Sequence, residues 1–165
     1  MQQGHQTDGG MSSEMTRKHY TMFGLNMLLS TIIMYLVMFE MIRGFGEFIQ
    51  NINFFYMALT MAMPMGVLML LMMGSMYPNK KLNVLLYIAL GLIFVLAFAA
   101  VRTQAAVGDK QFVRSMIPHH SGAILMCNQA SIKDAEIRDL CFKPNGIVQS
   151  QEREIEQMKR ILSRL

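Results

Sequence analysis

The sequence predicts an all-α protein in which three transmembrane helices precede a small helical domain outside the cytoplasm. Three apolar runs, at residues 22–42, 54–76 and 82–101, are each long enough to cross a bilayer as a helix. Beyond them the composition changes, because residues 102–165 hold 10 of the 15 basic residues and 7 of the 11 acidic ones. We therefore expect a membrane region at 22–101 and a water-exposed domain at 102–165.

The overall composition excludes several classes of protein. Of the 165 residues, 53% are hydrophobic, 16% are charged and 19 are methionine. These values exclude a disordered or fibrous chain and argue against an ordinary soluble domain. The net charge of +4 is too small to indicate a nucleic-acid-binding surface. The partner that the composition favours is a lipid bilayer and not a nucleic acid.

The first element along the chain, residues 1–21, is expected to be a disordered cytoplasmic tail. It is rich in Gly, Gln and Ser and shows no apolar period. His5, Met11, Met15 and His19 lie within it. These side chains could scavenge a metal ion, but their scattered placement favours an incidental origin.

The three apolar runs contain a single charged residue, Glu40. Eight of the nineteen methionines lie in the second run. Six of them follow three- and four-residue spacing: Met57, Met61, Met65, Met69, Met72 and Met76. They could line a thioether path for Cu(I) or simply pack. Packing is favoured because no His or Cys accompanies them.

The orientation follows from Lys and Arg in the short flanks of the runs. One side carries Arg17, Lys18, Lys80 and Lys81. The other side carries Arg43 and Arg102, with Lys110 and Arg114 further along. Because cytoplasmic flanks are enriched in Lys and Arg, we expect the N-terminus inside and residues 102–165 outside. The loop RGFGEFIQNIN between the first two runs suits a segment at the membrane interface.

The water-exposed domain is expected to be a small antiparallel helical bundle. Asp109 is predicted to cap a helix that starts at KQFVRSMI, and Pro118 either kinks this helix or opens a new one. SIKD supplies a turn with Asp134 as the next cap, and KPNG should end the helix that follows. Residues 147–165 then return to helical periodicity.

One face of the first helix in this domain carries candidate metal ligands. At about 100° per residue, Met116, His119, His120 and Met126 fall within one arc. Thioether and imidazole together suit Cu(I), and Met158 with Glu154 could complete or orient the site from the last helix. The alternative is that the methionines are core residues and that the histidines line a polar end of the bundle.

Cys127 and Cys141 flank the SIKD turn on opposite arms of a hairpin. We expect them to form a disulfide if the hairpin lies outside the cytoplasm. Two buried thiols, or Cys127 as a metal ligand, are the alternatives. Because no CxxC pair is present, a zinc site made of cysteines alone is excluded.

Two strings, FVRSMIPHHSGAILMCNQA and IVQSQEREIEQMKRIL, resemble the domain-of-unknown-function family three-hundred-and-five. Together with the apolar runs, the chain resembles the three-helix membrane version of that family. FKPNG intervenes before the last helix, where the family runs without interruption. The resemblance implies a ferritin-like four-helix bundle on the outer face of a bacterial inner membrane. Some relatives are associated with copper, and the resemblance brings no defined enzymatic activity.

The leading functional expectation is a membrane-anchored protein that binds or hands on Cu(I) without a catalytic step. Its partners would be the bilayer, the metal ion, and a second copy of the chain or other copper-handling proteins. A non-metal structural or interaction module is the alternative, with the histidines as a pH-sensitive contact. A ferritin-like redox enzyme is disfavoured, because the Glu-x-x-His motif of such centres is absent.

Overall fold

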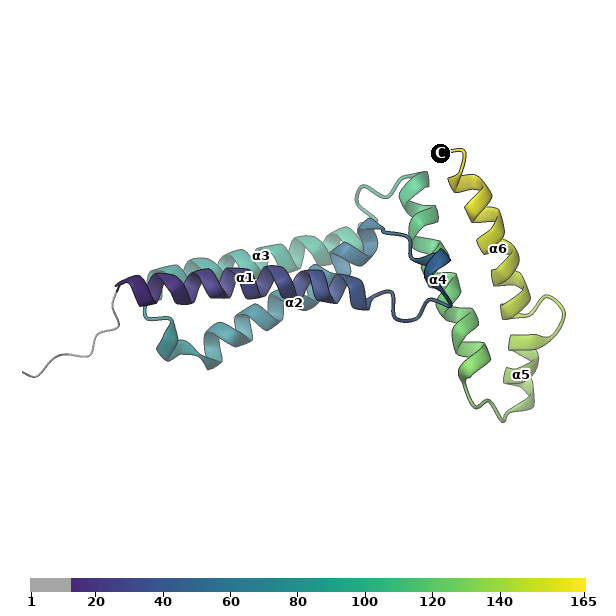
Figure 1. The fold of residues 1–165 in the computed structure, drawn as a ribbon, viewed down its shortest axis with the longest axis horizontal. Helices are drawn as coiled ribbons and strands as arrows, with labels where there is room; N and C mark the ends of the chain where they lie inside the picture. Colours follow the sequence, from purple (N-terminus) through teal and green to yellow (C-terminus); the bar gives the residue numbers. More distant parts are fainter. Residues whose placement is uncertain (1–12) are drawn as a thin grey trace, which may run out of the picture.

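The computed structural model describes residues 13–165, and these residues form helices and turns without a strand. Three long helices lie side by side at one end of the molecule (Figure 1): α1 (Ser13–Val37), α2 (Ile52–Met72) and α3 (Lys80–Thr103). The second group of helices lies across the other end: α4 (Asp109–Gln129), α5 (Ala135–Phe142) and α6 (Ile147–Leu162). Two short 3-10 helices complete the described part: η1 (Phe45–Glu47) and η2 (Gly74–Met76). The all-helical prediction is confirmed for residues 13–165.

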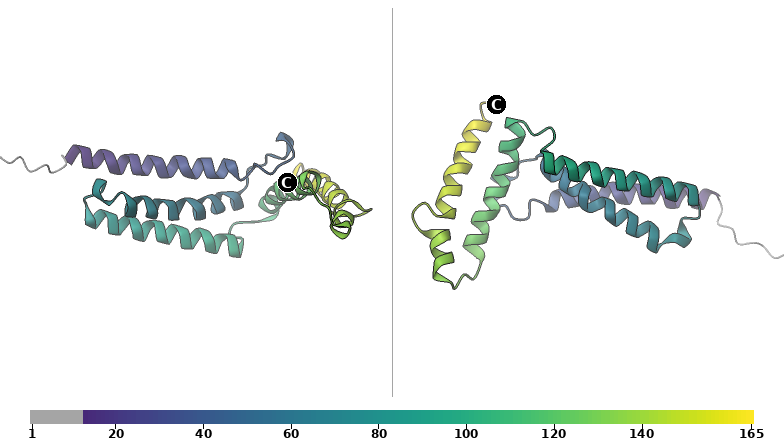
Figure 2. Two further views of the ribbon diagram at one scale, coloured as in Figure 1. Left: turned by 90° about the horizontal axis from the view of Figure 1, so that it is seen from below. Right: turned by 180° about the vertical axis from the view of Figure 1, so that it is seen from behind.

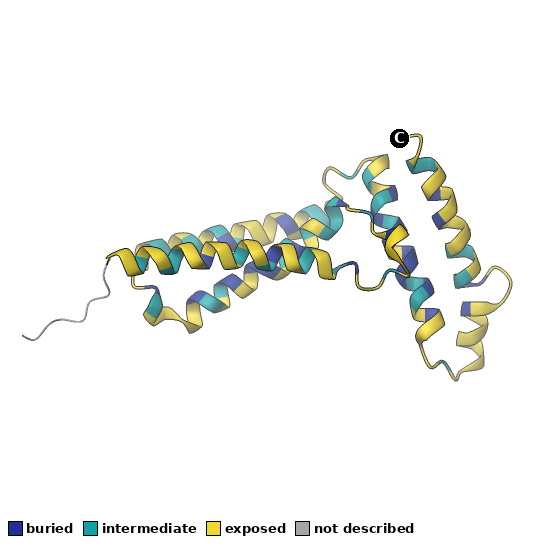
Figure 3. Cartoon of the chain, in the orientation of Figure 1, coloured by how far each residue is buried: buried dark blue, intermediate teal, exposed yellow. Residues whose placement is uncertain are grey.

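The three long helices are long and apolar enough to cross a membrane. Their outward faces are formed by apolar side chains that no other part of residues 13–165 covers, as the exposed colouring along them in Figure 3 shows. Leu85 and Leu71, for example, are 61% and 62% exposed. Exposed apolar surface of this extent is costly in water. A medium or partner other than water must therefore meet these faces.

The ends of the long helices differ from the predicted ends. α1 begins at Ser13, so the predicted tail boundary at residue 21 is wrong, and only residues 1–12, with His5 and Met11, lie outside the described residues. The polar residues of this first stretch continue the helix. α1 ends at Val37 rather than at 42 because Phe39 turns inward, where its ring packs 4.2 Å from that of Phe48 and 4.9 Å from that of Phe54.

Asparagine caps set the starts of α2 and α3. The side chain of Asn51 accepts a hydrogen bond from the backbone N–H of Phe54, and the side chain of Asn79 accepts one from Leu82. Such caps satisfy backbone donors that have no partner inside the helix. Both helices therefore begin two residues before the apolar runs that predict them.

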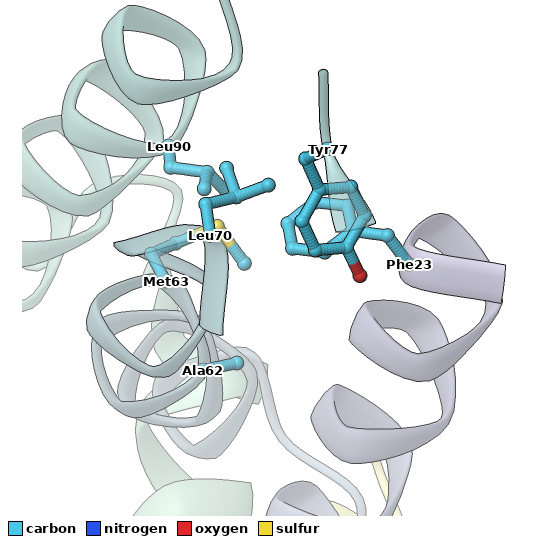
Figure 4. Packing of buried hydrophobic residues seen from close by; sticks show 6 residues of the cluster. All are labelled: Phe23, Ala62, Met63, Leu70, Tyr77 and Leu90. Atoms are coloured by element: carbon cyan, nitrogen blue, oxygen red, sulfur yellow. The ribbon is translucent and has the colours of Figure 1, made fainter. Parts of the chain in front are cut away.

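A small core holds the three long helices together. Its buried residues come from all three helices and from the turn after η2: Phe23, Ala62, Met63, Leu70, Tyr77 and Leu90 (Figure 4). The ring of Tyr77 packs edge-on against that of Phe23, 5.9 Å between centroids. α1 packs tightly against α2 at Gly66, where an added Cβ would lie 2.7 Å from the sulfur of Met27.

In the second group α6 packs antiparallel along α4 (Figure 1, Figure 2). The core between them contains Val113, Ile117, Ile124, Ile155 and Met158. Asp134 caps α5 by accepting from the N–H of Ile137, as predicted. Gly108 rather than Asp109 is the residue that precedes α4. Pro118 lies inside one continuous helix, so the prediction that it could open a new helix is not borne out.

KPNG ends α5 as predicted, and α6 starts at Ile147. Gly146 is buried in this turn, where an added Cβ would lie 2.8 Å from the carbonyl oxygen of Leu140. The FKPNG interruption therefore leaves α6 packed on α4. Residues 102–165 of one chain form three helices and not the four-helix bundle that the resemblance implies.

Candidate functional site

Helix α4 carries four of the six predicted ligands, but it presents them to two different neighbours. His119 and Met126 face the end of α1 and the start of α2, where they line a shared cavity. Met116, His120, Glu154 and Met158 lie on the side where α4 meets α6. The six predicted site residues are therefore divided into two groups. The division arises because consecutive helical residues point about 100° apart, so His119 and His120 cannot face one neighbour.

His120 is engaged at both ring nitrogens. Nδ1 lies 2.9 Å from the carbonyl oxygen of Met116, and Nε2 lies 2.7 Å from Oε2 of Glu154. Each ring nitrogen therefore has a hydrogen-bonding partner, one on α4 and one on α6. His120 is only 8% exposed. His120 thus ties α4 to α6, and it could bind a metal only by giving up one of these bonds.

The two methionines on the same side are core residues. Met158 is 9% exposed and belongs to the buried cluster between α4 and α6, and Met116 packs against that cluster. Methionine suits such positions because its unbranched side chain fills irregular space. These two sulfurs therefore sit among aliphatic side chains.

His119 and Met126 line a cavity of about 470 Å³ at the junction of the two helix groups. We call it the junction pocket. Three thioethers from outside α4 share it, Met38, Met41 and Met57. Its remaining lining residues are Val37, Glu40, Phe54, Pro118, Gly122 and Ala123. Gly122 lies against the loop after α1, and an added Cβ there would make an ordinary van der Waals contact, 3.5 Å from Cβ of Met41.

The donors of the junction pocket are soft. Four thioethers and one imidazole line it, with a single carboxylate, Glu40. Within residues 13–165, no group of three or more His, Cys, Asp and Glu side chains is placed to hold a metal ion. A metal site within this part of one chain would therefore draw on methionine sulfur, which selects Cu(I) among the biological metals.

A charged cluster beside the pocket joins the loop after α1 to α4 and α6. Glu47 is 7% exposed, and its carboxylate accepts hydrogen bonds from Ser121 and, at 2.6 Å, from Nη2 of Arg43. Arg43 also donates to Glu152 at 3.0 Å, and its backbone N–H donates to the Ser121 hydroxyl at 2.7 Å. Nζ of Lys159 lies 3.9 Å from Glu47.

These contacts keep Glu47 ionised. Burial alone would raise the pKa of the Glu47 carboxyl, but the hydrogen bonds from Arg43 and Ser121 and the charges of Arg43 and Lys159 lower it, and the balance lies below its ordinary value. The hydrogen bond and charge of Glu47, with Glu152, in turn raise the pKa of Arg43. A buried carboxylate with this many donors holds the two helix groups together.

Cys127 and Cys141 form a disulfide, as predicted, with their Cα atoms 5.7 Å apart. The bond links the last turn of α4 to the end of α5, so Cys127 is not available as a metal ligand. The disulfide closes the hairpin of α4 and α5 directly after Met126.

Two comparisons with known proteins identify relatives of this chain. Residues 97–162, from the end of α3 through α6, match the family model described as Domain of unknown function (DUF305). The uncharacterized protein L153 of Acanthamoeba polyphaga mimivirus is 36% identical over 122 residues, which cover 73% of this chain and 76% of L153. The chain belongs to the same family as L153, and its residues 97–162 match the DUF305 domain. No solved structure matches it.

The DUF305 match covers His119 and Met126 but not the part of the junction pocket that α1, the loop after it and α2 line. Met38, Met41 and Met57 lie outside residues 97–162. The sequence reasoning also missed Arg43 and Glu47, which it placed in a loop at the membrane interface. Their four-residue spacing was the available signal, since oppositely charged residues at i and i+4 can pair. Nothing in that spacing indicated Ser121 as the third partner.

Proposed function

We propose that this DUF305 protein is a membrane-anchored binding protein for Cu(I), with its metal site in the junction pocket. α1, α2 and α3 cross the bilayer, the N-terminus is cytoplasmic, and α4, α5 and α6 lie outside. The protein holds or hands on the ion in copper homeostasis or tolerance and performs no catalytic step. A bacterial inner membrane is the location that the family resemblance favours.

The membrane part of the proposal is supported by the exposed apolar faces of the three long helices. Lipid is the solvent in which such faces cost nothing, and helices satisfy their own backbone groups there. The orientation is supported by four cations at the end that carries α1's start and the α2–α3 turn: Arg17, Lys18, Lys80 and Lys81. The disulfide between Cys127 and Cys141 supports an oxidising compartment for the other end.

The metal part of the proposal depends on one observation. His119 and Met126 share a cavity with Met38, Met41 and Met57, so an imidazole and four thioethers from three segments of the chain converge on one space. Thioether sulfur is a soft ligand, and Cu(I) is the soft metal ion that such a site would bind. The chain's own residues position the donors: the cluster of Arg43, Glu47 and Ser121 fixes the loop that follows α1 against α4.

Exchanging methionine for leucine tests the proposal, because it removes sulfur and nearly preserves volume. We expect the full-length chain with Met41→Leu and Met126→Leu to compete for Cu(I) with a chromophoric Cu(I) chelator at least tenfold more weakly than the parent. The matched control is Met116→Leu with Met158→Leu, two sulfurs on the α6 side. It should retain the parent affinity.

The two variants separate the possible results. Weaker binding only in the control pair would move the site to the α4–α6 side. Unchanged affinity in both pairs would overturn copper binding in this domain. It would favour the structural module, in which the His120 bridge to Glu154 simply joins α4 to α6.

A further inference from the structure

A second cavity lies at the opposite end of the three long helices. It has a volume of about 520 Å³ and opens between α1 and the end of α2 with η2. Figures 1 and 2 show α2 diverging from α1 toward η2 at this end. We call it the end groove. Six of its lining residues carry a nitrogen or sulfur atom in the side chain: His19, Met22, Asn26, Met69, Met73 and Met76.

The ring of His19 is held with one nitrogen directed away from its anchor. Nδ1 lies 3.1 Å from the carbonyl oxygen of Met76, which can only accept, so Nδ1 carries the proton. Nε2 is then the nitrogen with a free lone pair, and no residue of 13–165 forms a hydrogen bond with it. An imidazole that donates one N–H to a backbone carbonyl and leaves the other nitrogen open is the usual arrangement of a metal-binding histidine.

The sulfurs around this ring come from both sides of the groove. Met22 lies on α1, Met69 lies on α2, and Met73 and Met76 lie at the turn through η2. Nδ2 of Asn26, on α1, lies 4.0 Å from Sδ of Met69. The sequence argument that no histidine accompanies the membrane methionines is therefore corrected, because His19 does.

The lining of the end groove discriminates between classes of ion. Among residues 13–165 it is lined by no carboxylate and no cysteine, so this lining lacks the oxygen ligands of Mg²⁺ and Ca²⁺ and the thiolates of a structural zinc site. Neutral thioethers and an imidazole suit a soft monovalent cation. The buried Tyr77, 3% exposed, forms the floor and keeps the turn against α1.

We propose that the end groove is a second binding site for a soft monovalent cation, Cu(I) or Ag(I), with Nε2 of His19 and the sulfurs of Met69, Met73 and Met76 as its donors. It shares no residue with the junction pocket, so the two sites lie at opposite ends of the bundle. The inference stands on the groove's own geometry. It rests on the proposed function only in taking copper as the physiological ion.

Methyl NMR of the full chain in detergent micelles tests the proposal, with methionine methyl groups labelled with ¹³C and Ag(I) as the redox-inert probe. The parent chain should bind two Ag(I) ions, and the methyl signals of Met73 and Met76 should shift on titration. The variant with Met73→Leu and Met76→Leu should bind one Ag(I) while the Met126 signal still shifts. Met61→Leu with Met65→Leu, on α2 but outside the groove, is the control and should still bind two.

The site-resolved signals separate this proposal from the preceding one. If the Met73 and Met76 signals of the parent stay unchanged at saturating Ag(I), the end groove is not a site, whatever the variants do. If these signals shift and that of Met126 does not, the end groove stands and the junction pocket fails. A His19→Ala variant should lose the Met73 and Met76 shifts and retain that of Met126, and unchanged shifts would remove His19 as a donor.

Discussion

The described histidines differ in which groups lie next to their ring nitrogens. His120 has an acceptor at both nitrogens, so it stabilises the contact between α4 and α6. His19 has an acceptor at one nitrogen only, so the other is available. His119 is exposed and opens onto the junction pocket. Residue type alone therefore does not identify a ligand.

Glu47 provides a prediction that concerns pH. Its pKa is lowered from the ordinary value of 4.5, so the ionised form stabilises the fold above pH 4.5 and the benefit is lost as the pH falls below it. We expect Glu47→Gln to melt several degrees below the parent at pH 7, by circular dichroism of the full chain in detergent. The gap should narrow as the pH falls from about 5 toward 3.

Glu156→Gln is the matched control, because Glu156 is an exposed carboxylate on α6. It should melt with the parent at every pH. A gap between Glu47→Gln and the parent that stays constant down to pH 3 would contradict the role given to the Glu47 charge.

At the scale of elements, the sequence predicted the long helices well and their ends poorly. Run length and the lack of charge are local properties, so residues 22–42, 54–76 and 82–101 all lie largely in helices. Helix ends depend on partners elsewhere. The ring of Phe39 stops the first helix by packing on Phe48 and Phe54, and the single-sequence pattern holds no sign of that contact.

The turn between α5 and α6 provides a prediction about an element boundary. Gly146→Ala would place a methyl group 2.8–3.0 Å from three backbone carbonyls that cannot move freely. Forcing atoms into a packed site typically costs about 1–3 kcal/mol. We expect the melting midpoint of the full chain to fall by several degrees. Gly108→Ala, at the start of α4, is the control, because its Cβ would meet open space.

An unchanged midpoint for Gly146→Ala, or an equal loss for both variants, would show that the turn relaxes around the added methyl. Comparing the melting midpoints of the two variants therefore tests the backbone contact and not the general preference of helix boundaries for glycine.

At the scale of the whole molecule, the arrangement of the two helix groups could not be read from the sequence. It depends on contacts between residues far apart in the chain, such as Arg43 with Glu152 and Glu47 with Ser121. The helical period correctly put candidate ligands on α4, but it could not tell which neighbour each side would meet. His119 and Met126 consequently share a pocket with Met57, for which the prediction had favoured packing in the membrane.

The proposed orientation provides a prediction for living cells. Both native cysteines are in the disulfide, so one added cysteine is the sole free thiol. Arg160→Cys on α6 should react with a membrane-impermeant maleimide on intact cells. Ser75→Cys, in the turn between α2 and α3, should react only after the cells are permeabilised. The reverse pattern would invert the topology, and labelling of both on intact cells would contradict a spanning bundle.

The loop of Arg43 and Glu47 has a mechanical consequence. The helices α4, α5 and α6 are attached to the long helices covalently through residues 104–108, and non-covalently both through this loop and through hydrogen bonds from the start of α2 to α4. A domain on one tether would swivel, whereas several separated attachments remove its rotational freedom. α4 and α6 lie across the axis of the long helices (Figure 1). In a spanning bundle, the mouth of the junction pocket therefore faces one fixed direction parallel to the membrane surface. A protein that exchanges an ion with it must match that direction of approach as well as its chemistry.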